Sequence, residues 1–137
     1  VNNWAAAGVS YQPGGSPAVA GTGICAKAVS GDTGTYVFTV VDALPASVKP
    51  FSVTTQFGVG VAQRIVTAGR VTLFVPTSAG ISYAGRNTGW AWTTGALASI
   101  RVGSVARAMP NVRLVKSSVS GGDGYQVIAG LLFGWGW

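Results

Sequence analysis

The C-terminal stretch Tyr125–Trp137, with the sequence YQVIAGLLFGWGW, carries the most regular pattern in the chain. Every second residue from Tyr125 is apolar or aromatic. The side chains at the positions between them become smaller toward the end, where they are Gly134 and Gly136. A period of two is typical of a β-strand, whose side chains point alternately to its two faces. No charge follows Asp123, so we expect this strand to be buried, either in a domain core or at the axis of an oligomer.

Upstream of this strand, short apolar runs alternate with turn sequences. The turn Ser120–Gly124 predicts a hairpin that joins the C-terminal strand to the one before it. Similar runs, rich in β-branched and aromatic residues, occupy Thr35–Val41, Phe51–Val59 and Arg70–Val75, and we expect Pro76 to end the last of these. No segment shows a sustained period of about 3.6. The pattern predicts an all-β fold, an antiparallel β-sandwich or jelly roll of about eight to ten short strands.

The N-terminal region differs from the rest of the chain. Residues 1–23 carry no charge and are rich in Gly, Pro, Ala and Asn. Within them, Pro13–Pro17 is typical of a turn or an extended linker. We interpret 1–23 as an extended N-terminal arm, which Trp4 anchors on a surface, and 24–137 as a single β-sandwich domain. The chain contains no run of about 18 apolar residues, so the sequence predicts no transmembrane helix.

The chain is poor in charge. Only 9% of its 137 residues are charged, against roughly 25% in a typical soluble domain. Two interpretations remain open: a barrel or sandwich with Ser and Thr on its outer face, or a subunit that hides much of its surface in an assembly. The net charge of +6 favours an acidic partner. Because the basic residues are scattered, we do not expect that partner to be nucleic acid.

Catalytic and metal-binding side chains are scarce. The sequence contains no His and no Glu, so common metal sites and Ser-His-Asp or Cys-His catalytic systems cannot be built. The three acidic residues, Asp32, Asp42 and Asp123, are expected to shape turns. Cys25 is expected to be a buried core thiol. We predict that the protein is not an enzyme and has no cofactor or metal.

The C-terminal strand resembles the last strands of two kinds of β protein. Leu131, Phe133, Trp135 and Trp137 resemble the alternating, aromatic-ended final strand of outer-membrane β-barrels. Elsewhere the long charged loops of that class are missing, and about eight spanning strands would strain this length. Tyr125–Phe133 resembles the buried final strand of trimeric jelly-roll modules, such as C1q-like, tumour-necrosis-factor-like and phage fibre or decoration domains. This second resemblance implies a trimeric virion component.

Three functions from different classes follow. The first, our main prediction, is a virion structural protein: a capsid decoration, cement or tail-fibre subunit that forms a homotrimer and binds other virion and capsid proteins. It would be made in the host cytoplasm and located in the virion, with neither a membrane nor nucleic acid as a partner. The second is a carbohydrate-binding, lectin-like module that contacts surface glycans. The third is a small outer-membrane β-barrel.

Candidate site residues belong to three groups. Aromatic residues often anchor interfaces, and those near the chain ends form the predicted assembly interface: Trp4, Tyr11, Phe133, Trp135 and Trp137. Three arginines spaced by six are candidates for contacts with an acidic partner: Arg101, Arg107 and Arg113. Exposed indoles can stack on sugar rings while nearby polar side chains form hydrogen bonds, which predicts a candidate glycan site. The alternative is that the indoles are buried in the core. It comprises Arg86, Asn87, Trp90 and Trp92.

Overall fold

The computed structural model describes residues 3–12, 18–29, 34–45, 53–84, 87–118 and 126–136. These residues form eight β-strands that follow one another around the molecule in sequence order. The strands are β1 (Asn3–Gln12), β2 (Ala18–Ala28), β3 (Thr35–Pro45), β4 (Val53–Ala68), β5 (Val71–Ala84), β6 (Asn87–Arg101), β7 (Ala106–Ser117) and β8 (Gln126–Gly136). Among the described residues, no helix is long and apolar enough to cross a membrane.

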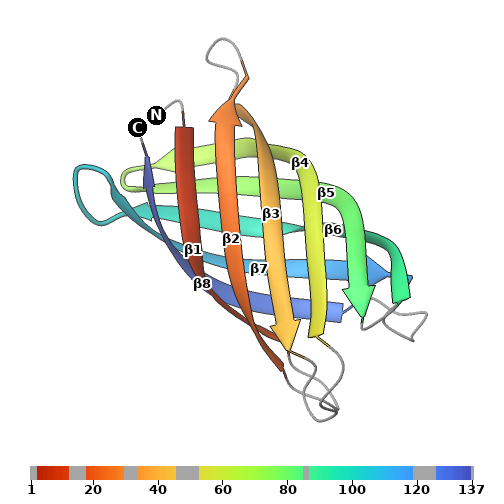
Figure 1. Cartoon of the computed structure of the whole chain (residues 1–137). Helices are drawn as coiled ribbons and strands as arrows, with labels where there is room; N and C mark the ends of the chain where they lie inside the picture. The colour runs from red at the N-terminus through yellow and green to blue at the C-terminus, as the bar shows by residue number, and fades with distance from the viewer. Residues whose placement is uncertain are drawn as a thin grey trace.

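The strands form a closed barrel (Figure 1). All neighbouring strands are antiparallel, and β8 returns to β1 with pairs that run from Trp4↔Gly136 to Tyr11↔Ala129. Closure leaves no unpaired strand edge. The all-β class is therefore confirmed, but the predicted sandwich or jelly roll is wrong. We call the end at which β1 begins and β8 finishes the terminal end, and the opposite end the far end.

The N-terminal residues are part of the barrel wall. Asn3–Gln12 is β1, which pairs with β2 on one side and with β8 on the other. The sequence predicts a separate arm over residues 1–23, but the structure places the described part of that region in two strands. Small side chains and a lack of charge are compatible with a strand whose two edges are both paired, and they were misread as an arm.

Alternation along each strand decides which side chains fill the barrel. In β3, Tyr36 and Phe38 are buried inside, whereas Val37 and Val41 are exposed on the outer wall. An eight-stranded barrel has an interior just wide enough for side chains to fill. The apolar part of that filling centres on the rings of Trp4, Tyr36 and Phe74, whose centroids lie 5.6 to 6.3 Å apart.

Inward-facing glycines allow neighbouring strands to bend closely past one another. A Cβ on Gly60 in β4 would lie 2.0 Å from the carbonyl oxygen of Thr77, and one on Gly80 in β5 would lie 1.8 Å from that of Phe57. No side chain fits at such distances. The glycines that weaken a flat strand are therefore the residues that let this sheet curl into a narrow barrel.

Two prolines lie inside strands rather than at strand ends. Pro76 is in β5 and Pro110 is in β7, and each lies where the pairing with β6 is interrupted. A proline lacks the N–H that a ladder needs, so such interruptions are where a sheet accepts it. Pro76 does not end a strand as predicted. The sequence predicts short strands, but β4, β5 and β6 have 16, 14 and 15 residues.

Candidate functional site

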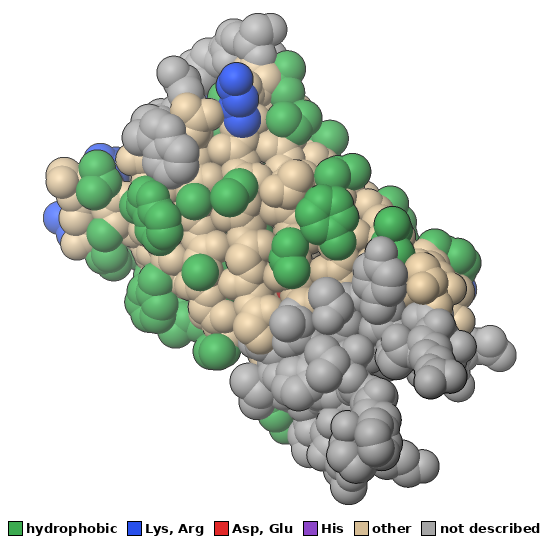
Figure 2. All heavy atoms as spheres, in the orientation of Figure 1, with side chains coloured by type: hydrophobic (Ala, Val, Ile, Leu, Met, Phe, Trp, Pro, Cys, Tyr) green, Lys and Arg blue, Asp and Glu red, His purple; other side chains and the backbone are tan. Residues whose placement is uncertain are grey.

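The outer wall of the barrel exposes many large apolar side chains. Large hydrophobic side chains are exposed on β1 and on β3 to β8, and Figure 2 shows them spread over one face. Examples from around the wall are Val9, Val37, Val59, Val75, Trp90, Val112 and Leu131. A soluble monomer rarely exposes a contiguous apolar patch of more than a few hundred Å². The described wall therefore differs from the surface of an ordinary soluble monomer.

Charge on the wall is confined to its two borders. Among the described strand residues that face outward, the charged ones are Lys27 and Lys116. Lys27 lies one residue before the end of β2, at the terminal end, and Lys116 lies one residue before the end of β7, at the far end. Between these borders the described outward positions form an uncharged belt around the barrel, which we call the apolar belt.

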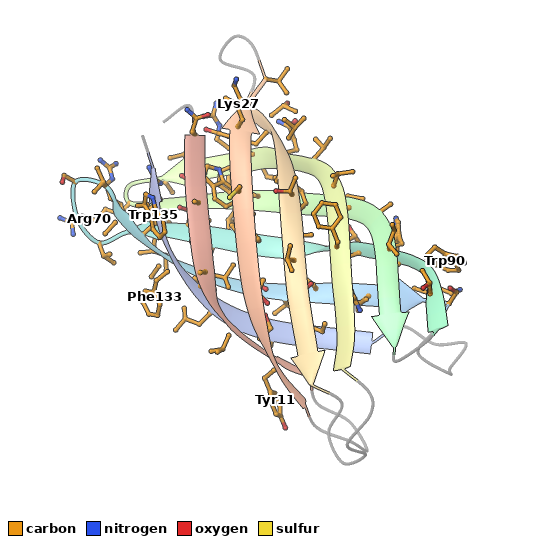
Figure 3. All side chains as sticks on the ribbon, viewed as in Figure 1. Tyr11, Lys27, Arg70, Trp90, Phe133 and Trp135 are labelled. Carbon is orange, nitrogen blue, oxygen red and sulfur yellow. The ribbon has the colours of Figure 1, made fainter. Side chains whose placement is uncertain are left out.

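Exposed aromatic side chains lie toward both borders of the apolar belt. Trp135 and Phe133 on β8 point outward toward the terminal end, with 52% and 60% of their surfaces exposed. Tyr11 on β1 and Trp90 on β6 point outward toward the far end (Figure 3). Aromatic side chains at two levels of an apolar wall match the interfaces between lipid and water, where a ring with a polar tip is favoured.

The far half of the lumen contains a polar network. Arg113 on β7 and Asp42 on β3 form a bidentate ion pair, with both Nη–Oδ distances 2.8 Å. Thr22 Oγ1 donates to Asp42 Oδ1 at 2.7 Å, and the Ser10 and Thr22 hydroxyls are 2.8 Å apart. Arg113 Nη2 also donates to Ser10 Oγ at 3.3 Å. These groups join four strands across the lumen, and all are buried.

The polar network and the apolar cluster together fill the barrel. The carboxylate of Asp42 and the guanidinium of Arg113 are both almost completely buried. Nearer the terminal end, the lumen is filled by Leu132, Met109 and Leu97 around the aromatic rings. An ion pair is expected in such a place because a buried charge is tolerated only when it is paired and hydrogen-bonded. The lumen is a packed interior rather than an open channel.

The structure places two of the three candidate arginines, Arg101 and Arg107, together at the terminal end, and the third, Arg113, apart from them in the far half of the lumen. Arg113 is buried in the lumen, Arg107 is half-buried near the terminal end, and Arg101 is exposed at that end. Arg113 contacts an internal carboxylate, so it cannot reach an acidic partner outside the barrel. A strand spacing of six does keep side chains on one face, but in this barrel that face is the lumen.

The other predicted site residues divide between the two faces of the wall. Trp4 is only 5% exposed and lies inside the barrel, so it cannot anchor a neighbouring subunit. Tyr11, Phe133 and Trp135 lie on the outer wall. Trp90 is exposed there as well, and Trp92 is half-buried on the same face. Arg86, Trp137 and the side chain of Asn87 lie outside the described residues.

Two residues have roles that the sequence analysis missed. Asp42 was expected to shape a turn, but it is the buried partner of Arg113. Cys25 was expected in the core, but it is exposed on the outer wall. The available signal was the alternation along the strand: Ile24 and Ala26 are buried, which places Cys25 between them on the opposite face.

Comparison with known proteins identifies the fold. No family model and no curated protein matches the sequence. Three solved structures are similar along almost the whole chain. The N-terminal β-barrel domain of Pseudomonas aeruginosa OprF has a TM-score of 0.67 at 12% identity, covering 98% of this chain and 96% of that one. Neisserial surface protein A has a TM-score of 0.65 at 10% identity, covering 97% and 93%. A structure from the de novo design of transmembrane β-barrels has a TM-score of 0.62 at 16% identity, covering 97% and 94%.

These findings overturn the predictions that depended on a jelly roll. The virion structural function, the virion location and the homotrimer with capsid partners are contradicted, because the chain is a closed barrel whose structural neighbours are barrels. The lectin alternative is contradicted on the same ground. The exclusion of a membrane as a partner is also wrong, since the neighbours include transmembrane barrels. The third interpretation, a small barrel of the outer-membrane kind, agrees with the fold.

Proposed function

We propose that this protein is a small integral β-barrel of a bacterial outer membrane, inserted as a monomer, with lipid against its apolar belt and no catalytic activity. The single observation that carries the proposal is the apolar belt, bordered by Lys27 and Lys116. The outer wall is apolar, whereas the outer wall of a soluble barrel would be polar. Lipid is a partner that can cover an apolar belt on all sides of a barrel.

The backbone meets the requirement that a bilayer imposes. Lipid offers no hydrogen-bond partners, so a spanning sheet must pair all of its strands, and a closed barrel does so. Crossing the hydrocarbon layer takes about 9–11 tilted residues per strand. The eight strands have 10 to 16 residues each, and they are inclined to the barrel axis (Figure 1). Each strand is long enough to span.

The packed lumen supports an anchoring or structural role rather than transport through an open pore. Side chains fill the middle of the barrel, and the Asp42–Arg113 pair holds β3 to β7 across it. Barrels of this strand number have interiors that side chains fill, whereas open water-filled channels belong to wider barrels of about 16–18 strands. The names of the neighbours, a surface protein and transmembrane barrels, support a location in a membrane.

Insertion can be tested with lipids brominated at known depths of the acyl chain. Two single-tryptophan proteins are needed, one retaining Trp135 on the wall and one retaining Trp4 in the lumen, with Phe at the other tryptophan positions. After refolding from urea into vesicles, bromine should quench the Trp135 fluorescence strongly and that of Trp4 weakly. The two indoles differ in the face of the wall on which they lie, so Trp4 is the matched control.

Two results would contradict the proposal. One is a protein that folds in water without detergent or lipid and stays in the supernatant when vesicles are pelleted. The other is equal quenching of Trp4 and Trp135 in a protein whose circular dichroism shows native β-structure, because the two faces of the wall would then not differ in their contact with lipid.

A further inference from the structure

The terminal end of the barrel contains a hollow with a strongly basic border. Its volume is about 280 Å³, close to the lower end of the range of roughly 300–1,000 Å³ for pockets that hold small ligands. Arg64, Arg70, Arg101 and Arg107 line it, and Trp4, Tyr36 and Phe74 lie beneath. We call this hollow the arginine cup. Membrane insertion does not require it, because the cup opens at the end of the barrel and not on the lipid-facing wall.

Local structure brings these arginines together from different parts of the chain. Gly69, with a φ of 59°, makes the tight turn between β4 and β5 that places Arg70 at the rim (Figure 3). The backbone N–H of Arg101 donates to the carbonyl oxygen of Arg70 at 2.9 Å, which ties the end of β6 to this turn. Arg107 Nη1 donates to Ser99 Oγ at 3.1 Å, which holds the guanidinium against the cup wall.

The positive charges of Arg70, Arg101 and Arg107 are not neutralised by a carboxylate in the described part of the chain. There, the acidic side chain is Asp42, which lies in the far half of the lumen and is paired with Arg113. No carboxylate among the described residues contacts Arg70, Arg101 or Arg107. Clustered guanidinium groups repel one another unless an anion lies between them, and they are donors suited to bidentate binding of phosphate or carboxylate.

A second feature of the cup also calls for a hydrogen-bond acceptor. The indole Nε1 of Trp4, a residue that lines the cup and is only 5% exposed, is buried without a hydrogen-bond partner. An indole N–H is a donor only, and a buried donor left unpaired is costly. An acceptor oxygen bound in the cup would satisfy it, while the neighbouring guanidinium groups would balance the charge.

From these observations we infer that the arginine cup binds a small anion with more than one oxyanion group, of the phosphate or carboxylate class. Two sources could supply that chemistry: a free anion from the water at the terminal end, or the headgroup of an anionic lipid. In both cases Arg101 and Arg107 bind the oxygens, and Trp4 Nε1 donates to one of them from the floor.

Inorganic pyrophosphate is a suitable probe of the cup, titrated calorimetrically into the full chain folded in an uncharged detergent. We expect saturable binding that weakens about tenfold in Arg101→Gln and in Arg107→Gln, because each substitution removes a charged donor. Lys27→Gln is the matched control, since it removes one positive charge at the same end but on the outer wall. Its effect should stay within about twofold, the size of a screened surface charge.

A second variant tests the floor of the cup separately from its charge. Trp4→Phe keeps a ring in the lumen but removes the Nε1–H, and it should weaken pyrophosphate binding without a change in net charge. To distinguish the two sources, the titration is repeated in nanodiscs of phosphatidylcholine and in nanodiscs that also contain phosphatidylglycerol. A free-anion site gives the same affinity in both. A headgroup site shows weaker pyrophosphate binding in the second, and Arg101→Gln abolishes the difference.

The inference is overturned if the folded protein in the uncharged detergent shows no saturable binding of pyrophosphate. It is also overturned if Lys27→Gln weakens binding as much as Arg101→Gln, because the attraction would then come from net charge and not from the cup. Folding of every variant is checked by circular dichroism in the same detergent. Failure of membrane insertion would leave these detergent measurements unchanged, so the two proposals fail separately.

Discussion

The outer wall and the lumen of this barrel are built from the same strands but have opposite character. On β3, Val37 and Val41 face outward and are exposed, while Asp42 faces inward and is completely buried. In a soluble protein the apolar face of a strand turns inward and the polar face turns to water. Here the ion pair and the hydroxyl network are inside, and large apolar side chains are outside. This arrangement is the one expected if lipid surrounds the wall, as proposed above, because the lumen must then satisfy its own polar groups.

The largest expected effect comes from breaking the lumen side of this comparison. Arg113→Met removes the partner of Asp42 and leaves a buried charge unpaired, which should lower the free energy of unfolding by about 3–5 kcal/mol. Urea titration of the protein in detergent micelles, followed by tryptophan fluorescence, would measure the loss. The double variant Asp42→Leu with Arg113→Met should recover most of it, since an apolar filling of similar size is often as stable as a buried pair. A loss under about 1 kcal/mol for the single variant would mean that water reaches this carboxylate.

The next effect breaks the outer side. Val59 lies in β4 within the apolar belt, and Val59→Arg should destabilise the barrel in vesicles by about 2–4 kcal/mol, the cost of an arginine near the middle of the bilayer. Val102→Arg is its control, because Val102 is equally exposed but lies after the end of β6, where the cost should be about 0–1 kcal/mol. In a protein surrounded by water, both exposed positions would change stability by less than about 0.5 kcal/mol. If both substitutions changed stability equally and by this small amount, the outer wall would behave like the surface of a soluble protein.

A smaller effect is expected within the polar network. Thr22→Val keeps the shape of the side chain but removes the hydroxyl that donates to Asp42 and contacts Ser10. Loss of a buried donor to a carboxylate should lower the free energy of unfolding by about 1–3 kcal/mol. Thr77→Val is the matched control, because the Thr77 hydroxyl pairs with that of Thr94 on the outer wall. If Thr77→Val were the more costly of the two, the network would not be what holds the lumen together.

The last prediction requires no substitution and should leave the fold unchanged. Cys25 is exposed on the outer wall, so in vesicles its thiol should lie among acyl chains. A charged, water-soluble maleimide does not enter the acyl-chain region, because moving a charge out of water is costly, so it reaches only thiols in contact with water. A water-soluble maleimide should therefore label the folded protein in vesicles slowly and the urea-unfolded protein rapidly, as measured by mass spectrometry. Rapid labelling in vesicles would place this part of the wall in water.

β8 shows how far the sequence could be interpreted. The period of two in Tyr125–Trp137 correctly predicts a strand, and Gln126–Gly136 is one. The large face of Phe133 and Trp135 was expected to be buried, yet it is exposed, and the glycine face points into the lumen. A narrow barrel has room only for small side chains where strands pass closely, so a Cβ on Gly134 would lie 2.7 Å from the carbonyl oxygen of Ala5. Burial of the larger face is a rule for soluble proteins, and that assumption produced the error.

The candidate site was less predictable than the strands, because its residues are distant in the chain. Asp42 and Arg113 are 71 positions apart, and no local pattern links them. Arg70 and Arg107 share the arginine cup only because β4, β5, β6 and β7 are neighbours around the barrel. The jelly-roll and virion predictions failed for a related reason: alternation and turn residues are the same in a sandwich and in a barrel, and only strand pairing distinguishes them.

The sequence by itself determined the elements: strands of period two, turns rich in Gly, Ser and Asn, and a chain with too little charge for an ordinary soluble surface. These are local properties, which depend on the residue and its near neighbours. The tertiary structure decided the rest, namely the closure of β8 onto β1, the face of each strand that turns inward, and the tolerance of Pro76 and Pro110 beside β6. Those features depend on which strands lie side by side, and a period of two has the same form whichever face is inside.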